Sequence, residues 1–375
     1  MAKQTTYSDS GVNVELGNEA SKVLYEAAKL TWENRKGKLG EIVELFPGFS
    51  GLRGMHVGGL PDDAYTNLGF DGVGTKIEVA ERMSRHDTIA FDLFGMVVDD
   101  AVIRGTEPVM IGSLLDVRTF GRDEHSHLAQ ITELGQGYVK AAKAANVAIV
   151  NGEVAEIGAR VHGHGDFNYN WGAGVAWFGR KSRMITGFDA KPGDYLVAFR
   201  ESGFRSNGLS MVRRVLGQVY GANWHEELFE GQRLGDIVLQ PTRIYTPAVV
   251  EMFGGFEGEP RVKITAAAHI TGGGIPEKLG RALQPSGLGA LIEESFAPNP
   301  LMLHVQEVGN VNDEEAYKTF NMGPGMILAT REPAKVIDIA EEHGIEAKMV
   351  GQLTRNMGIR IKNMGQWQEK EYLTF

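Results

Sequence analysis

The chain of 375 residues contains no cysteine. Disulfide bonds, thiolate metal ligands and cysteine nucleophiles are therefore excluded from its chemistry. The sequence also lacks an apolar run near the roughly 18 residues that a membrane-spanning helix needs. Its first residues, MAKQTTYSDSG, lack the apolar core of a signal peptide. From these absences we expect a cytoplasmic protein.

Positive charge is in deficit as well. The sequence has 38 Lys and Arg against 48 Asp and Glu, which gives a formal net charge of −10 at pH 7. This balance disfavours binding of nucleic acid or an anionic membrane by general electrostatics. An anionic ligand must instead be held locally, by backbone N–H groups, by a few placed Lys or Arg side chains, or through a divalent metal.

Glycine is abundant, with 49 residues, nearly twice the number that an average usage of about 7% predicts. The length exceeds the size at which a single core stops growing, so we expect two domains. Residues 181–193 (KSRMITGFDAKPG) have a relaxed pattern that ends in a Pro-Gly turn signal. We therefore predict domains at 1–185 and 190–355, followed by a C-terminal tail at 356–375.

Segments with strand and helix patterns alternate in both halves, which predicts a mixed α/β fold. In the first half, an extended segment at 65–70 leads into the glycine loop DGVGTK (71–76), and an amphipathic helix follows from Asp87. In the second half, Ser206 or Asn207 is expected to cap one helix. Pro276 is expected to open another helix after the glycines of HITGGG.

The loop DGVGTK (71–76) combines groups that bind phosphate and metal directly after a strand. Gly72 and Gly74 let backbone N–H groups approach an anion, and Lys76 can offset phosphate charge. Asp71 can hold the magnesium that usually accompanies ATP. The spacing is not that of a P-loop. From composition alone, a solvated turn is the alternative.

The helix that follows carries three acids, Asp92, Asp99 and Asp100. Offsets of seven and eight residues return close to one helical face, and the neighbouring residues are apolar. Carboxylates in such surroundings are costly unless they are paired or bind a metal. We favour metal coordination over ordinary exposed helix acids.

Three further loops carry candidate ligand groups. NGEVAE (151–156) places Glu153 after a strand, at the end where α/β proteins commonly build sites, as a metal ligand or as a simple loop acid. SGFRSNG (202–208) places Arg205 beside a helix N-terminus, a natural phosphate site. HITGGG (269–274) is a second glycine-rich helix start. Each of these two loops either binds phosphate or is a structural device.

In their order along the chain, these segments resemble one family, phosphoribosylformylglycinamidine cyclo-ligase, from Tyr7 to about residue 354. The segments that carry the resemblance are YSDSGVNVELGN, DGVGTK, RHDTIAFDL with the pair Asp99-Asp100, NGEVAE, SGFRSNGLSMVR, PTRIY, HITGGG and YKTFNMGPGM.

The resemblance implies a two-domain α/β (α+β) protein that forms a homodimer. Its N-terminal domain would bind ATP and pair its sheet with that of the second subunit, while its C-terminal domain would hold a phosphorylated ribonucleotide. The reaction would be the ATP-dependent ring closure of formylglycinamidine ribonucleotide to 5-aminoimidazole ribonucleotide in de novo purine biosynthesis. ATP would phosphorylate the formyl oxygen, and a nitrogen would then displace phosphate to form the C–N bond of a ligase reaction.

The resemblance also implies roles for individual residues. The catalytic set would be Asp71, Lys76 and Asp100, and Mg²⁺ would be held by Asp71, Asp100 and Glu153. The nucleotide would be bound by Gly72, Gly74, Thr75, Lys76, His86 and Asp87. The substrate and its phosphate would be bound by Ser206, Asn207, Gly208, Thr271, Gly272 and Gly273.

Two positions depart from the family pattern: Arg205 stands where the family usually has a histidine, and Asn151 opens the loop that usually reads GGET. Substrate identity is therefore the open point. The alternatives are another ATP-using enzyme on the same scaffold, such as thiamine-monophosphate kinase, and a non-catalytic nucleotide-binding paralogue. The segments PTRIY and FNMGPGM favour the cyclo-ligase over the kinase, and retention of Asp71, Lys76 and Asp100 argues against the paralogue.

Overall fold

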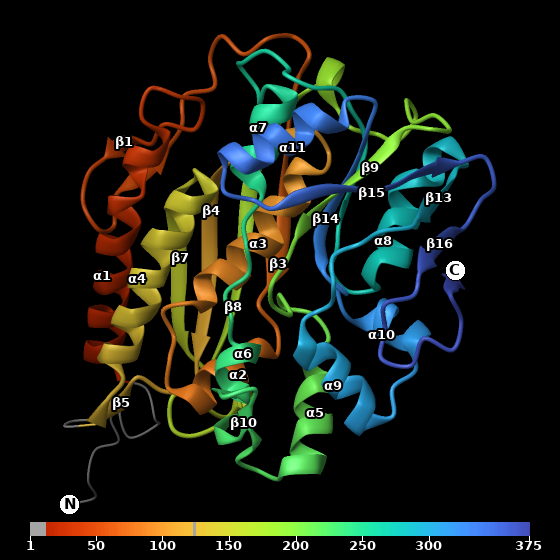
Figure 1. The fold of residues 1–375 in the computed structure, drawn as a ribbon. Coiled ribbons are helices and arrows are strands. Elements are labelled where there is room, and N and C mark those ends of the chain that lie inside the picture. The colour runs from red at the N-terminus through yellow and green to blue at the C-terminus, as the bar shows by residue number, and fades with distance from the viewer. Residues whose placement is uncertain (1–12, 123–124) are drawn as a thin grey trace, which may run out of the picture. The chain divides into compact units, whose positions relative to one another are not determined.

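The computed structural model describes residues 13–122 and 125–375. The chain divides into two compact units (Figure 1). The first unit consists of residues 1–60, 67–97 and 108–177, and the second of residues 61–66, 98–107 and 178–375. The chain therefore enters the second unit twice before residue 178. One of these entries includes the last turn of helix α3 (Ile89–Val102).

The first unit is built on a sheet that has four strands among the described residues, in the order β3-β8-β4-β7. These strands are β3 (Ala64–Gly72), β8 (Tyr169–Arg180), β4 (Thr106–Val117) and β7 (Ala148–Glu156). The odd-numbered residues of β4 and β8 are mostly buried, whereas the even-numbered ones are mostly part-exposed or exposed. This alternation marks a sheet with one covered face.

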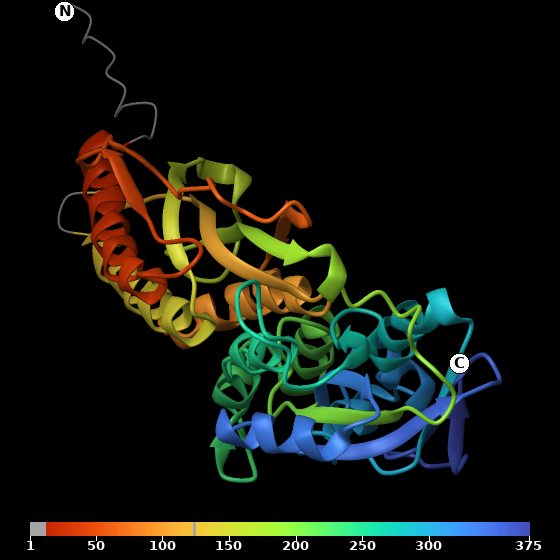
Figure 2. The same ribbon diagram turned by 90° about the horizontal axis from the view of Figure 1, so that it is seen from above.

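Helices α1 (Val14–Leu30), α3 and α4 (Leu128–Ala145) accompany this sheet. Helices α1 and α4 lie side by side next to β7, as Figures 1 and 2 show. On the covered face, Tyr138 of α4 packs against Phe94 of α3 and Trp171 of β8, with ring centroids 5.4 and 5.2 Å away. The covered face is thus an aromatic and aliphatic core.

Helix α1 begins earlier than its pattern indicates. Its N-cap is Asn13, whose side chain accepts a hydrogen bond from the backbone N–H of Leu16 at 3.1 Å. The buried residues of α1 are Ala20, Leu24, Ala27 and Ala28, a spacing that places them on one face. The amphipathic pattern is clear only from residue 20, because the first turn is partly exposed.

Strand β7 continues through residues 151–156, so the prediction that NGEVAE forms a loop is wrong. The strand pairs in parallel with β4 as far as Val117 and Glu156. At the start of β7, two side chains from the segment after α1 donate hydrogen bonds to backbone carbonyls on the outer edge of the strand. Trp32 Nε1 donates to the carbonyl of Ile149 at 2.8 Å, and Asn34 Nδ2 donates to that of Val147 at 2.9 Å. Tertiary pairing, which a local pattern does not report, extends the strand.

The second unit contains a sheet of seven strands, all of them within the described chain, in the order β12-β14-β9-β15-β13-β16-β17. Its strands are β9 (Tyr195–Arg200), β12 (Ile264–His269), β13 (Gly289–Ile292), β14 (Pro324–Thr330), β15 (Ala347–Thr354), β16 (Ile359–Lys362) and β17 (Tyr372–Thr374). Of the six neighbouring strand pairs in this sheet, only the β13–β16 pair is parallel. Residues beyond 356 thus contribute two strands.

Seven helices of the described chain belong to the second unit. They are α5 (Leu209–Tyr220), α6 (Leu234–Val238), α7 (Thr246–Phe253), α8 (Gly274–Leu283), α9 (Pro300–Gly309), α10 (Asp313–Thr319) and α11 (Pro333–Glu342). Helices α7 and α11 lie together (Figure 1) and share a buried core with β9, which includes Phe199, Met252 and Val336. Besides short 3-10 helices, the remaining elements of the described residues are α2 (Lys76–Met83) and the short strands β1 (Val43–Phe46), β2 (Leu52–Gly54), β5 (Gly121–Arg122), β6 (His125–Ser126), β10 (Leu228–Phe229) and β11 (Gln232–Arg233).

Glycine sets both predicted helix starts of the second unit. The residue at the N-cap position of α5 is Gly208, with a φ of 74°, so the prediction that Ser206 or Asn207 caps this helix is wrong. Helix α8 begins at Gly274 rather than at Pro276. A Cβ on Gly274 would lie 1.8 Å from the carbonyl oxygen of Tyr317, so only glycine fits there. Within residues 13–122 and 125–375, no helix is both long and apolar enough to cross a membrane.

Glu81 of α2 is a buried acid that holds the segment before β8. Its carboxylate accepts the backbone N–H groups of His164 at 2.7 Å and Tyr169 at 3.3 Å. Burial outweighs these hydrogen bonds and raises the pKa of Glu81 to about 6.

A pKa that is raised in the folded state links the stability of the first unit to pH. The contribution of protonated Glu81 is complete below its ordinary pKa of 4.5 and is lost as pH rises through about 6. We expect the free energy of unfolding to lose about 2 kcal/mol over this range relative to Glu81→Gln, whose amide does not titrate. Urea unfolding at pH 4.5 and 7 measures the difference. Exposed Glu19→Gln is the control, and equal pH dependence in wild type and Glu81→Gln would contradict the expectation.

Candidate functional site

The loop DGVGTK joins β3 to α2. Asp71 and Gly72 end the strand, and Lys76 is the first residue of the helix. Gly74 has a φ of 72°, a conformation that favours glycine. The Asp71 carboxylate accepts the N–H of Gly72 at 2.7 Å, and the N–H of Val73 donates to the carbonyl of Trp171 at 3.1 Å. The loop is therefore an ordered connection between a strand and a helix.

Lys76 and Asp92 form a buried ion pair inside the first unit. The distance from Lys76 Nζ to Asp92 Oδ1 is 2.7 Å, and both side chains are 0% exposed. Removal of one partner from such a pair leaves an uncompensated buried charge. The sequence predicts a triphosphate contact for Lys76 and a metal contact for Asp92; in this structure each group engages the other. Both predicted roles stay predictions.

His86 and Asp87 precede α3 and differ in their surroundings. The ring of His86 is buried against Phe167, and its Nδ1 lies 3.1 Å from the hydroxyl of Tyr169. Burial lowers the pKa of His86 to about 4, so the imidazole is neutral at pH 7. The carboxylate of Asp87 is partly exposed and lies 3.7 Å from Lys140 Nζ. His86 can therefore act only as a neutral hydrogen-bonding group at pH 7.

Asp71 and Glu153, two of the predicted metal ligands, lie on opposite edge strands of the four-stranded sheet. Strands β8 and β4 separate β3 from β7. With neighbouring strands about 4.8 Å apart, the two edges are roughly 14 Å apart. Asp100, the third predicted ligand, belongs to the second unit. Across the described residues, no group of three or more His, Cys, Asp or Glu side chains is gathered closely enough to hold a metal ion.

Arg205 is the centre of a buried polar network in the second unit. Its guanidinium donates to Glu201 at 2.9 Å and lies 3.4 Å from Asp99 Oδ2, and none of the three side chains is more than 2% exposed. It also lies over the ring of Tyr245, 5.4 Å from the centroid. Burial opposes the charge of Arg205, but its interactions with Glu201, Tyr245 and Asp99 together outweigh burial and raise the pKa. The guanidinium is thus engaged by two carboxylates rather than open to a phosphate.

His269 links this network to Asp100. Its Nε2 faces the guanidinium of Arg205, and its Nδ1 lies 2.7 Å from Asp100 Oδ1. Arginine can only donate, so Nε2 accepts and Nδ1 carries the hydrogen that Asp100 receives. Burial acts to raise the pKa of Asp100, but the hydrogen bond from His269 and the nearby positive charges together outweigh burial and lower the pKa. Asp100, whose side chain is 56% exposed, therefore presents an oriented, ionised carboxylate.

Asp99 and Asp100 are neighbours with different environments. Asp99 is fully buried, and its Oδ1 accepts from the hydroxyl of Thr246 at 2.9 Å and the N–H of Tyr245 at 3.1 Å. Burial raises the pKa of Asp99. Of the predicted acid pair, only Asp100 is placed to meet a ligand.

The two predicted substrate loops of the second unit lie next to each other. A Cβ on Gly272 would lie 3.6 Å from Asn207 Oδ1. Ser206, Asn207, Gly208 and Gly273 are partly exposed, Gly272 is exposed, and Thr271 is largely buried. The N–H of Gly274 is used within the loop, because it donates to the carbonyl of Thr271 at 2.8 Å. The structure thus joins the SNG and TGGG segments into one glycine-rich surface.

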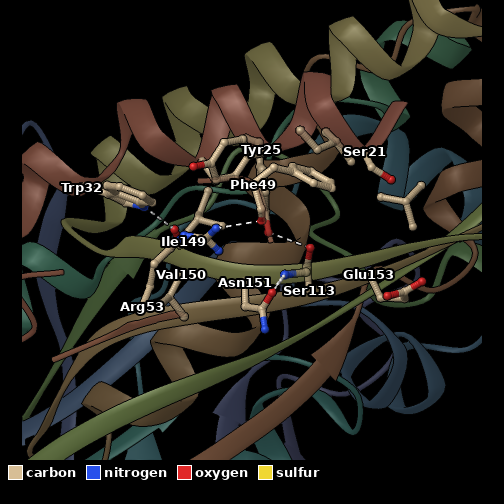
Figure 3. Close-up of a pocket in the computed structure, with 15 residues that line it drawn as sticks. Ser21, Tyr25, Trp32, Phe49, Arg53, Ser113, Ile149, Val150, Asn151 and Glu153 are labelled. Atoms are coloured by element: carbon tan, nitrogen blue, oxygen red, sulfur yellow. Dashed lines mark hydrogen bonds between the residues drawn. The ribbon is translucent and has the colours of Figure 1, made fainter. Parts of the chain in front are cut away.

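The first unit contains a cavity of about 330 Å³ that NGEVAE lines in part and whose aromatic wall belongs to no sequence motif. Figure 3 shows Tyr25 and Phe49 on one side of it and Ser113, Asn151 and Glu153 on the other. The guanidinium of Arg53 lies 4.9 Å from the ring centroid of Tyr25. The aromatic wall suits a flat ring, and the opposite side offers polar groups. The aromatic residues share no sequence period, so only the folded α1 and the β1–β2 hairpin gather them.

Comparisons with known proteins assign the chain to a family. Two family models match the chain: "AIR synthase related protein, N-terminal domain" at residues 56–172 and "AIR synthase related protein, C-terminal domain" at residues 191–362. A phosphoribosylformylglycinamidine cyclo-ligase of Methanocaldococcus jannaschii is 32% identical over 358 residues, which cover 94% of this chain and 93% of the relative. The enzyme of that name from Nitrosococcus oceani is 34% identical over 357 residues, which cover 93% and 91%.

Solved structures share the fold at low sequence identity. A thiamine-monophosphate kinase from Stenotrophomonas maltophilia matches with a TM-score of 0.63 and 13% identity, over 91% of this chain and 96% of that one. The hydrogenase maturation protein HypE in complex with ATP matches with a TM-score of 0.52 and 15% identity, over 84% and 85%. The predicted mixed α/β fold of this superfamily is confirmed. By its near full-length identity to named relatives, the chain belongs to the phosphoribosylformylglycinamidine cyclo-ligase family.

Proposed function

We propose that the chain is a ligase that closes the imidazole ring of 5-aminoimidazole ribonucleotide, with formylglycinamidine ribonucleotide and ATP as substrates. The observation that carries this proposal is the 32–34% identity to cyclo-ligases over more than nine-tenths of both chains. The thiamine-monophosphate kinase, which represents the rival reaction, shares the fold at only 13% identity. The ATP in the HypE complex supports nucleotide use by this fold.

The reaction needs activation of a poor leaving group. ATP transfers its terminal phosphoryl group to the formyl oxygen and is released as ADP. The formyl oxygen thereby becomes part of a phosphate leaving group. A nitrogen of the substrate then attacks the formyl carbon, the C–N bond forms, the nitrogen loses a proton, and phosphate leaves with the C–O bond electrons. Catalysis of this kind depends on positioning and charge stabilisation.

The residues of the second unit provide such positioning. His269 orients the exposed carboxylate of Asp100, and the glycine-rich surface of the SNG and TGGG segments offers backbone groups to an anion. The predicted Mg²⁺ ligands Asp71, Asp100 and Glu153 are carboxylates, the donors that Mg²⁺ prefers. When bound, the ion neutralises phosphate charge.

A homodimer is part of the proposal, and the first unit supports it in two ways. The open face of its sheet carries exposed apolar side chains, with Leu68 58%, Phe70 76% and Leu114 47% exposed. Such an apolar patch indicates an interaction surface. In addition, Asp71 and Glu153 occupy opposite edges of one sheet. A second copy of the sheet, edge to edge, would bring these carboxylates closer than one subunit does.

Purified protein with ATP, Mg²⁺ and formylglycinamidine ribonucleotide should yield 5-aminoimidazole ribonucleotide and an equal amount of ADP. Chromatography of both products measures the reaction. Thiamine monophosphate replaces the ribonucleotide as the control acceptor and should release no ADP. ADP release with thiamine monophosphate, or tight ATP binding without turnover, would contradict the proposal.

The role of Lys76 in ATP turnover requires a variant that keeps the core intact. We expect Lys76→Met to lose about 3–5 kcal/mol of unfolding free energy, because it leaves Asp92 buried and charged. The double variant Lys76→Met with Asp92→Leu should recover most of that loss while ADP release stays at least about 100-fold below wild type. Urea unfolding and ADP release are measured on the same samples.

Lys143→Met, an exposed substitution on α4, is the matched control and should behave as wild type. A well-folded double variant with full ATP turnover would remove Lys76 from the nucleotide site.

Charge on the open face of the sheet should separate the subunits. We expect Leu114→Asp to be monomeric, because a carboxylate would be buried in an apolar interface, and to lose at least about tenfold of the activity. Light scattering gives the mass, and circular dichroism checks that the chain is folded. Phe188→Asp, at a 73% exposed position in the second unit, is the control. A monomeric wild type with full activity would refute the proposed dimer.

A further inference from the structure

A small groove in the second unit gathers positive side chains outside the residues predicted for substrate binding. Its volume is about 180 Å³, and it lies between the end of α3, strand β12 and helix α8. Ala267 and Ala268 of β12 line its floor. Arg104, Lys278 and Arg281 supply its positive charge.

The spacing of the groove residues brings them to one place. On α8, Lys278 and Arg281 are three residues apart and therefore share a helix face. At the other wall, Asp100 and Arg104 are four residues apart. The turn continues past the end of α3, because the N–H of Arg104 donates to the carbonyl of Ala101 at 3.1 Å. Two helical faces thus converge over the floor of β12.

The groove has an excess of positive charge on an acidic protein. Asp100 is the one carboxylate among the described residues that line it. Arg281 also pairs with Glu277, but Arg104 and Lys278 form no ion pair with any residue in the described part of the chain. The net positive charge of the side chains that line the groove attracts an anion.

We propose that this groove, rather than the SNG and TGGG segments, binds the phosphate monoester of the ribonucleotide substrate, an inference that rests on the proposed function. A phosphate monoester carries a charge of about −1.5 to −2 at pH 7, which Arg104, Lys278 and Arg281 can match. Strand β12, the floor of the groove, leads through His269 into the TGGG loop that is expected to face the substrate. One ligand can therefore place its phosphate in the groove and its reacting end near that loop.

The size of the groove favours a monoester over a nucleoside triphosphate. Its volume of about 180 Å³ is little more than half that of the cavity in the first unit. A triphosphate is normally accompanied by Mg²⁺, which requires several oxygen donors. This groove offers mostly cations, so it suits a single phosphate group.

Ribose 5-phosphate tests the groove without the reaction. Titration calorimetry should detect binding to wild type, and Arg104→Gln and Lys278→Gln should each weaken it about tenfold, since each loses one charge-assisted contact. Lys278→Arg keeps the charge and should keep most of the affinity. The control Lys335→Gln, on exposed α11, should match wild type, and unphosphorylated ribose should bind none of the proteins. Unchanged affinity in both Gln variants would overturn the proposal.

Steady-state kinetics separate this proposal from the proposed function. In the Gln variants, KM for formylglycinamidine ribonucleotide should rise about tenfold, with kcat and KM for ATP unchanged. A rise in KM for ATP instead would overturn the assignment in favour of the triphosphate. If the wild-type protein closes no ring, the proposed function is refuted, but calorimetry still measures whether the groove binds ribose 5-phosphate. If wild type closes the ring and the variants bind normally, only the groove assignment fails.

Discussion

The buried guanidinium of Arg205 is the interaction on which the second unit depends. It joins Glu201, which follows β9, to Asp99 in the last turns of α3, and it meets His269 at the end of β12. Tyr245, at the start of α7, covers the guanidinium and donates its hydroxyl to the carbonyl of Arg200. A cation among two carboxylates, an imidazole and a ring holds residues from four separate elements to one geometry. A histidine at this position would offer fewer donors and a charge that titrates.

That constraint extends outward to the groups that meet a ligand. Because Arg205 occupies one nitrogen of His269, the other nitrogen must donate to Asp100, and the carboxylate is oriented toward the surface. Arg205 itself adopts a φ of 57°, a conformation that is uncommon for a residue with a side chain of this size and is maintained by its many contacts. Arg205 is thus a positioning residue that acts on Asp100 through His269.

Local patterns predicted the elements whose signals are local. The glycine loop at 71–76 and the amphipathic helix that became α3 both follow from periodicity and turn composition. The predictions that were wrong depended on tertiary contacts. NGEVAE continues as a strand because β4 pairs with it, and α5 starts at Gly208 because the chain there needs a positive φ. The partner of Lys76 was also beyond local reach, since the ion pair joins two different helices.

The candidate site shows the same limit. The sequence supplied the two glycine-rich loops, and the structure placed Gly272 beside Asn207. The sequence also indicated the acids Asp71 and Glu153, but not that they lie on opposite edges of one sheet. The aromatic wall of the cavity and the cations of the groove belong to no motif, because their residues come from segments that only folding brings together. Function within this family was readable from motif order, whereas the geometry of binding was not.

The buried pair of Lys76 and Asp92 also restricts how this sequence can drift over evolutionary time. A change at either position alone leaves a lone charge in a core that excludes water, so intermediates with one substitution are selected against. Substitutions at positions 76 and 92 are therefore expected to occur together. Descendants are expected to keep both residues, or to lose both together in favour of a well-packed apolar pair.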